Sequence, residues 1–109
     1  MEGEVERRIA ANEARFRRVN EAISRGQWPG EADESVGFRC ECGTLGCSGL
    51  LELTSLEYQR IRTNPRRFVV LPGHQHEDVE KVVETRPTYL VVEKTDEAGE
   101  VAEATDPRE

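Results

Sequence analysis

The first 26 residues carry a repeating pattern of apolar positions. Steps of four and three residues alternate along it, and one member is polar: Val5, Ile9, Asn12, Phe16, Val19 and Ile23. This spacing places all six side chains on one stripe of a helix. No proline interrupts the segment, and Gly26 stands where a C-terminal cap is expected. The pattern predicts a long helix within residues 1–26.

The stripe admits two interpretations. An amphipathic helix most often packs its apolar stripe against its own domain. Alternatively, two copies of the chain associate through this helix, with Asn12 fixing their register as a buried polar residue does in a coiled coil. The residues that would form this contact are Ile9, Asn12, Phe16, Val19 and Ile23.

After Gly26 the helical periodicity stops. Residues 27–36 are rich in turn formers and acids, which indicates a linker. Residues 37–53 then predict a strand, a glycine-rich turn and a second strand. The sequence TSLE at 54–57 is a capping box that begins a short helix, and this helix must end before Pro65.

The remaining apolar runs predict further strands. Residues 66–73 read as a strand that ends in a turn, and DVEKVVET and TYLVVEK read as a hairpin, although EDVEKVVE could also form a short helix. From residue 96 the chain is acidic, and Val101 is its one large apolar residue, so we expect a disordered tail over 96–109. The prediction is an α+β fold in which a long N-terminal helix precedes a small, mostly antiparallel β domain over residues 37–95, with one short helix and a single zinc knuckle.

Cysteines change this picture most. All three in the 109-residue chain fall within eight positions, as Cys40, Cys42 and Cys47, and glycines flank them. Clustered thiols in a reducing compartment more often indicate a metal or redox chemistry than a disulfide. The C-x2-C pattern of a thiol redox enzyme is absent. Thiolates are preferred zinc ligands, and glycines let the backbone fold around the sulfurs.

Zinc usually takes four ligands, so one more is needed. The two histidines lie together in LPGHQHE, as His74 and His76. Because the turn at Pro72 and Gly73 would present His74 from a fixed backbone, we expect a structural site of Cys40, Cys42, Cys47 and His74, with His76 as the alternative fourth ligand. An iron–sulfur cluster is the alternative cofactor.

A run of basic residues suggests a second kind of site. The segment 58–67 could contact an anion or nucleic acid through Arg60, Arg62, Arg66 and Arg67. The favoured interpretation is a solvated surface paired with nearby acids. The net charge of −7 argues against sequence-independent binding to nucleic acid or anionic lipid.

Two absences bear on location. No apolar run approaches the roughly 20 residues that span a bilayer, and the first residues lack the apolar core of a secretory signal. We therefore expect a cytoplasmic protein that does not enter the membrane.

Several motifs together resemble a family of small uncharacterised actinobacterial proteins. These are FRCECG with its third cysteine, LTSLEYQRIRTNPRRFVVLPGH, VEKVVE and YLVVEK, and the resemblance extends from about Asn12 to Pro107. Because the PGH sequence recurs with the cysteines in that family, the resemblance supports His74 as a ligand. It implies no activity or partner.

The sequence thus predicts a small zinc-binding protein that acts as an interaction or regulatory module. Its N-terminal helix would contact a protein partner or a second copy. The alternatives are a protein that binds nucleic acid or the transcription machinery through the 58–67 arginines, and a zinc-dependent or redox enzyme.

Overall fold

The protein is a mixed α+β fold with a long N-terminal helix and two small antiparallel sheets. This computed structural model describes residues 2–26, 33–44 and 46–107, and within the first helix it describes side chains from Arg7 onward. In chain order the elements are α1 (Glu2–Arg25), β1 (Ser35–Arg39), β2 (Leu50–Thr54), α2 (Ser55–Ile61), β3 (Arg67–Val70), β4 (Glu80–Thr85), β5 (Leu90–Lys94) and α3 (Asp96–Ala104). The predicted fold class is confirmed.

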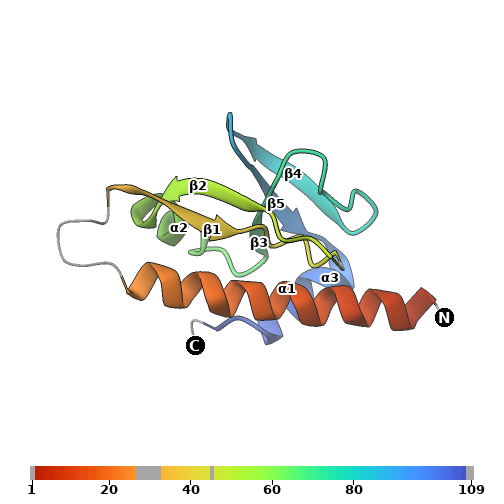
Figure 1. Cartoon of the computed structure of the whole chain (residues 1–109). Coiled ribbons are helices and arrows are strands. Elements are labelled where there is room, and N and C mark those ends of the chain that lie inside the picture. Colours follow the sequence, from red (N-terminus) through yellow and green to blue (C-terminus); the bar gives the residue numbers. More distant parts are fainter. Residues whose placement is uncertain (1, 27–32, 45, 108–109) are drawn as a thin grey trace.

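The sheets lie on one side of α1 (Figure 1). One sheet is the β1–β2 pair, and the other has the order β3-β5-β4. β4 and β5 form the hairpin expected from their alternating apolar residues, with an irregularity between Val82 and Glu84. Among the described residues, no helix has both the length and the apolar character needed to cross a membrane.

Local sequence signals explain where α2 begins and ends. Thr54 accepts a hydrogen bond from the Glu57 amide at 3.0 Å, and the Glu57 carboxylate accepts one from the Thr54 amide at 3.0 Å. This is the predicted capping box. The helix ends at Ile61, short of Pro65. Its buried face brings Tyr58 into the core, where the ring stacks on Phe38 with a centroid distance of 4.8 Å.

The core lies between the sheets, α2 and α3. It is built mainly from Phe38, Leu51, Leu53, Tyr58, Ile61, Phe68, Val69, Val70, Tyr89, Leu90, Val91, Val92 and Ala102. The strands contribute most of these residues because their alternate side chains face one side of each sheet.

The helix α1 docks on this body through polar side chains. Its buried residues recur at helical spacing and, apart from one alanine, are all polar: Glu13, Ala14, Arg17, Asn20, Glu21 and Ser24. This face is different from the apolar stripe that the sequence pattern picks out. Each buried charge must therefore find a partner inside the protein.

Arg17 meets backbone carbonyls. Its guanidinium donates to Pro65 O and to Ala102 O, each at 2.7 Å, and lies over the Phe68 ring at 4.3 Å from the centroid. The side chain is fully buried. Arg17 thus connects α1 to both the β3 entry and α3.

The other buried charges form ion pairs. Arg62 lies between Glu21 and Asp106, with nitrogen–oxygen distances of 3.7 and 2.5 Å. Lys94 lies between Glu13 and Glu80, both at 2.5 Å. Both cations are almost fully buried, so loss of either cation would leave two carboxylates without their partner.

The apolar stripe lies along the flank of this interface. Ile23 packs against the core, Phe16 lies under the Arg39 guanidinium, and Asn12 donates to Gly43 O at 3.2 Å. Val19 remains 39% exposed. The helix therefore packs against its own domain, as the first interpretation held, but mainly through its polar face and only partly through the apolar stripe. Asn12 has a partner in its own chain, and self-association through the stripe stays a prediction.

The C-terminal segment differs from expectation. Residues 96–104 form α3 where we expected a disordered tail, and that part of the prediction is wrong. This helix buries little apolar surface, since its buried residues are Gly99 and Ala102. Arg17 also attaches it to α1 by donating to the Ala102 carbonyl. The expected linker falls largely on residues 27–32, which lie outside the described residues, while Ser35 and Val36 belong to β1.

The Glu13–Lys94 pair predicts a dependence of stability on pH. Burial raises the pKa of Glu13 from 4.5 to about 7, so between these values the folded protein holds a proton that the unfolded chain has released. The free energy of unfolding should fall by about 2–3 kcal/mol as pH rises from 5 to 8 because of this group. Urea unfolding of the zinc-saturated protein and of Glu13→Gln across this range isolates the contribution. Parallel curves for the two proteins would contradict it.

Candidate metal centre

Three turns bring the candidate ligands together. Cys40 and Cys42 follow β1, Cys47 precedes β2, and His74 follows β3. The last turn is closed by a hydrogen bond from the His74 amide to Leu71 O at 2.9 Å, and Gly73 has φ of 89°. A positive φ at the third residue of a β-turn is typical of a type II turn, which favours glycine there.

A second glycine lets the cysteine turn approach α1. Gly43 has φ of 71°, and a Cβ there would lie 2.5 Å from the backbone oxygen of Ile9. Any larger residue would separate the turn from the helix.

The four donor atoms lie close enough together to hold one metal ion. His74 Nδ1 lies 3.8 Å from the sulfur of Cys40 and 3.6 Å from those of Cys42 and Cys47. Zinc with Zn–S of about 2.3 Å and Zn–N of about 2.0–2.1 Å would separate sulfur from nitrogen by about 3.6 Å. All four atoms lie within 4.8 Å of one another. The predicted Cys3His set is therefore brought together at one point.

His76 is not part of this group. Its Nε2 lies 2.8 Å from the carbonyl oxygen of Cys42, and its backbone amide donates to Glu80 at 2.8 Å. The structure thus places His74, and not His76, beside the three sulfurs, and turns the His76 ring to the backbone of Cys42. Contacts of this kind orient the ligands themselves.

The pKa values of two of the thiols are shifted in opposite directions. A hydrogen bond with Cys40 lowers the pKa of Cys42 to about 3, and the same bond together with burial raises the pKa of Cys40. The amide of Leu71 donates to the Cys40 sulfur at 3.3 Å. A metal ion that binds here displaces the remaining protons.

The donor set would fill all four positions of a zinc ion. Catalytic zinc keeps one position open for water, whereas four protein ligands close the coordination sphere. Two of the ligands are buried and two are half-buried. The centre can join the cysteine turn to the turn after β3, which are 27 residues apart in sequence between Cys47 and His74.

Glu41, between the first two ligands, is a residue that sequence reasoning missed. It is fully buried, and its carboxylate accepts hydrogen bonds from the Tyr58 hydroxyl, the Asn20 amide and the Val69 backbone N–H at 2.7, 2.8 and 2.9 Å. Burial raises its pKa. The signal was the position of Glu41 between two candidate ligands, because a predicted strand through 40–42 would turn Glu41 to the side opposite the two cysteines; in the structure residues 41 and 42 lie in a turn after β1.

The arginines of 58–67 do not form a common basic surface. Arg62 is buried, so its predicted place in a surface patch is wrong. The other three each pair with a carboxylate: Arg60 with Glu84, Arg66 with Glu103 and Arg67 with Glu93. Pairing of this kind was the favoured interpretation of the segment.

Metal stoichiometry tests the centre. We expect one zinc per chain in the purified protein, and cobalt substitution should give the absorption of a tetrahedral ion with three thiolates. Cys47→Ala and His74→Ala should lose stoichiometric metal, because three donors bind zinc much more weakly than four. His76→Ala serves as the control and should keep one ion. Equal retention by His74→Ala would refute the assignment.

Glu41→Gln tests the carboxylate under the metal turn. All three partners of Glu41 are donors in this structure, so the amide NH2 of glutamine must oppose at least one of them. The free energy of unfolding should fall by about 1–3 kcal/mol in denaturant titrations. Glu52→Gln, on the exposed side of β2, should change it by less than about 0.5 kcal/mol. A similar small change in both variants would show that Glu41 does not hold the turn.

No protein-family model, curated protein or solved structure matches this chain. The resemblance inferred from the cysteine and PGH motifs therefore stays a prediction. What the centre can do follows from its own donor atoms and from the surfaces around it.

Proposed function

We propose that this protein is a cytoplasmic zinc-binding interaction module. The metal centre would hold its fold, and the outward face of α1 would dock an acidic segment of another protein. The observation that carries the proposal is the composition of that face.

Zinc is the favoured ion because the four donors converge on one centre. A two-iron cluster distributes its ligands over two metal ions and would need them in two separated pairs. Here His74 Nδ1 is nearly equidistant from the three sulfurs, at 3.6–3.8 Å. Three thiolates with one imidazole are also a common structural zinc set.

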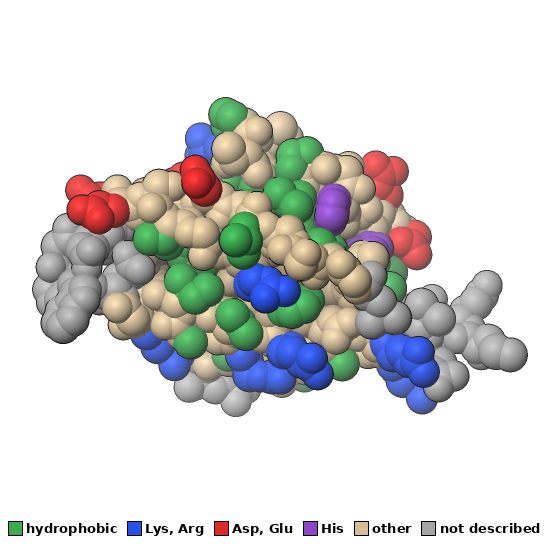
Figure 2. Space-filling model, viewed as in Figure 1, with side chains coloured by type: hydrophobic (Ala, Val, Ile, Leu, Met, Phe, Trp, Pro, Cys, Tyr) green, Lys and Arg blue, Asp and Glu red, His purple; other side chains and the backbone are tan. Residues whose placement is uncertain are grey.

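Basic residues dominate the exposed face of α1. From Arg7 onward, its exposed side chains are Arg7, Arg8, Ala11, Arg15, Arg18, Val19, Ala22 and Arg25. Positions 7 to 25 span about 27 Å of helix. Figure 2 shows basic side chains gathered along the lower edge over α1, while the acidic side chains on this view lie away from it.

The two acids of α1 whose side chains the structure describes from Arg7 onward, Glu13 and Glu21, do not lie on this face. Glu13 and Glu21 point into the protein and pair with Lys94 and Arg62. Among the described residues, no carboxylate forms an ion pair with Arg7, Arg15, Arg18 or Arg25. A basic face is thus kept on a chain whose net charge is −7.

An acidic protein segment suits this face better than other polyanions. Only alanines and Val19 lie among the arginines, so the hydroxyl, amide and aromatic groups that accompany nucleic-acid contacts are missing. The excess of 22 acids over 15 basic residues opposes a long polyanion or an anionic membrane. Two copies meeting through this face would place arginine against arginine. Small alanines do allow a partner helix to approach closely.

Charge reversal on α1 tests the proposal. Zinc-loaded full-length protein should capture an acidic protein by cross-linking in its native cells, and Arg15→Glu with Arg18→Glu should abolish this capture. Arg60→Glu with Lys81→Glu changes two exposed cations elsewhere and should leave the capture intact. Capture unaffected by the α1 reversal would contradict the proposal. Loss of duplex-DNA binding in the same variant, with no acidic protein captured, would replace it with a nucleic-acid partner.

A further inference from the structure

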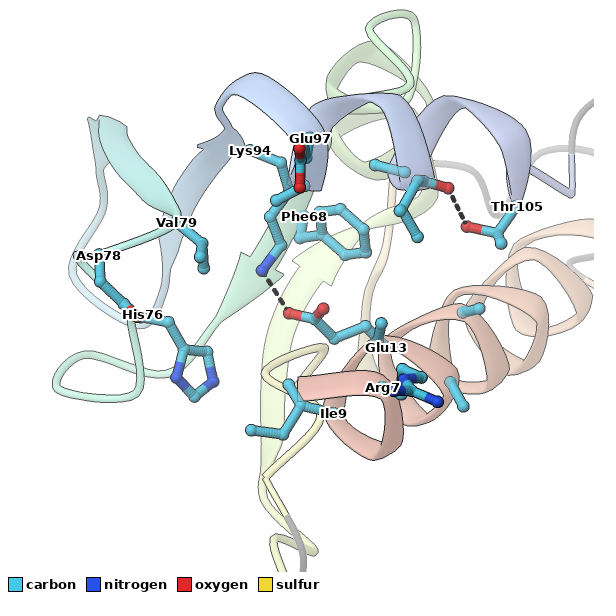
Figure 3. Close-up of a pocket in the computed structure, with 16 residues that line it drawn as sticks. Arg7, Ile9, Glu13, Phe68, His76, Asp78, Val79, Lys94, Glu97 and Thr105 are labelled. Atoms are coloured by element: carbon cyan, nitrogen blue, oxygen red, sulfur yellow. Dashed lines mark hydrogen bonds and ion pairs between the residues drawn. The ribbon is translucent and has the colours of Figure 1, made fainter. Parts of the chain in front are cut away.

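A cavity of about 630 Å³ lies between α1, α3 and the loop before β4 (Figure 3). Much of its wall is apolar and built from small side chains, including Ile9, Ala10, Ala14, Ala98 and Val101, with Phe68 at its inner end. This size and character are typical of sites that hold small organic ligands. The cavity does not include any of the four metal ligands.

Glu13 and Lys94 meet inside this cavity. Figure 3 shows the Glu13 carboxylate pointing into it, with one oxygen bonded to the Lys94 ammonium. Oε2 makes this bond at 2.5 Å. Among the described residues, Oε1 accepts no hydrogen bond, although the residue is only 6% exposed. A buried carboxylate therefore has one unused acceptor facing the empty volume.

The ion group around Glu13 has an excess of negative charge. Lys94 is shared with Glu80, whose second oxygen accepts the His76 amide at 2.8 Å. One ammonium thus serves two carboxylates. This imbalance is intrinsic to the protein and is independent of the metal.

The surrounding charges do not remove the imbalance. Among the ionised side chains that line the cavity, Arg7 and Lys94 are cationic, whereas Glu13, Asp78 and Glu97 are acidic. Glu80 adds a further carboxylate behind Lys94. The titratable ring of His76 also faces the cavity, from the loop before β4.

We propose that this cavity binds a primary amine with a short apolar chain, whose ammonium donates to Oε1 of Glu13 and whose chain lies along the alanine-lined walls. The shared chemistry has two sources, a free alkylamine or the lysine side chain of a partner protein. A cationic donor supplies both the missing hydrogen bond and the missing positive charge. A neutral alcohol supplies only the first, and a carboxylate supplies neither.

The titration of Glu13 agrees with this assignment. Burial raises its pKa to about 7, which shows that the protein interior leaves the carboxylate under-compensated. A bound ammonium favours the ionised form. Amine affinity should therefore increase by about tenfold between pH 6 and pH 8 as Glu13 loses its proton.

Ligand titrations followed by methyl NMR test the proposal on the zinc-loaded full-length protein. Hexylamine should shift the methyl resonances of Ile9, Ala98 and Val101 in a saturable way, whereas hexanol and hexanoate should not. Nα-acetyl-lysine amide, tested in parallel, represents a protein lysine, and the tighter binder of the two amines identifies the source. Absence of saturable shifts with both amines, or equal shifts with hexanol, would overturn the proposal.

Variants place the binding at Glu13 and in the cavity. Glu13→Gln should weaken hexylamine binding by about tenfold or more, the usual scale for a hydrogen bond to a charged group. Ala98→Phe fills the cavity and should abolish binding without touching the ion group. Ala104→Phe is the same change on an exposed part of α3 outside the cavity and should leave binding unchanged. Retention of affinity in Ala98→Phe would show that the amine binds elsewhere.

Discussion

The buried carboxylate of Glu41 joins the metal turn to the rest of the protein. Its neighbours Cys40 and Cys42 face the metal, while its own side chain receives hydrogen bonds from α1, α2 and β3. Its backbone amide also donates to Val69 O at 2.8 Å. A buried carboxyl group needs such hydrogen bonds to replace those it would make with water. The metal turn and the docking of α1 therefore depend on one another.

The layer beneath α1 extends the same principle along the helix. Successive turns of α1 each meet a different partner: Glu13 meets Lys94, Arg17 the Ala102 carbonyl, Glu21 Arg62, and Ser24 Ser55. Buried ion pairs contribute little net stability compared with apolar contacts, but breaking one is costly. A shift of α1 by one turn would mispair every member of this layer. The layer therefore fixes the position of the helix, while the apolar core provides most of the stabilisation.

This division explains what the sequence could and could not predict. The grouping of the four candidate ligands could be predicted because thiolate chemistry, the ligand count and the turn at Gly73 are local signals. The docking face of α1 could not be predicted in this way. A search for apolar periodicity does not detect buried charges, whose partners can be distant in sequence, as Glu13 and Lys94 are at 81 residues apart. For the same reason Arg62 read as a surface residue. α3 was missed because it needs only small side chains at its buried positions.

The loop after β3 connects the metal centre to the cavity. His74 and His76 are two residues apart. His74 lies beside the cysteine sulfurs, while His76 lines the cavity and contacts the carbonyl of Cys42. On the other side, Gly43 holds the cysteine turn against Ile9 and Asn12 of α1. His76 and α1 form two walls of the cavity. Both contact the cysteine turn, His76 at the Cys42 carbonyl and α1 at Gly43. A metal ion that closes this centre would therefore also brace two walls of the cavity, although the cavity contains none of the four candidate ligands.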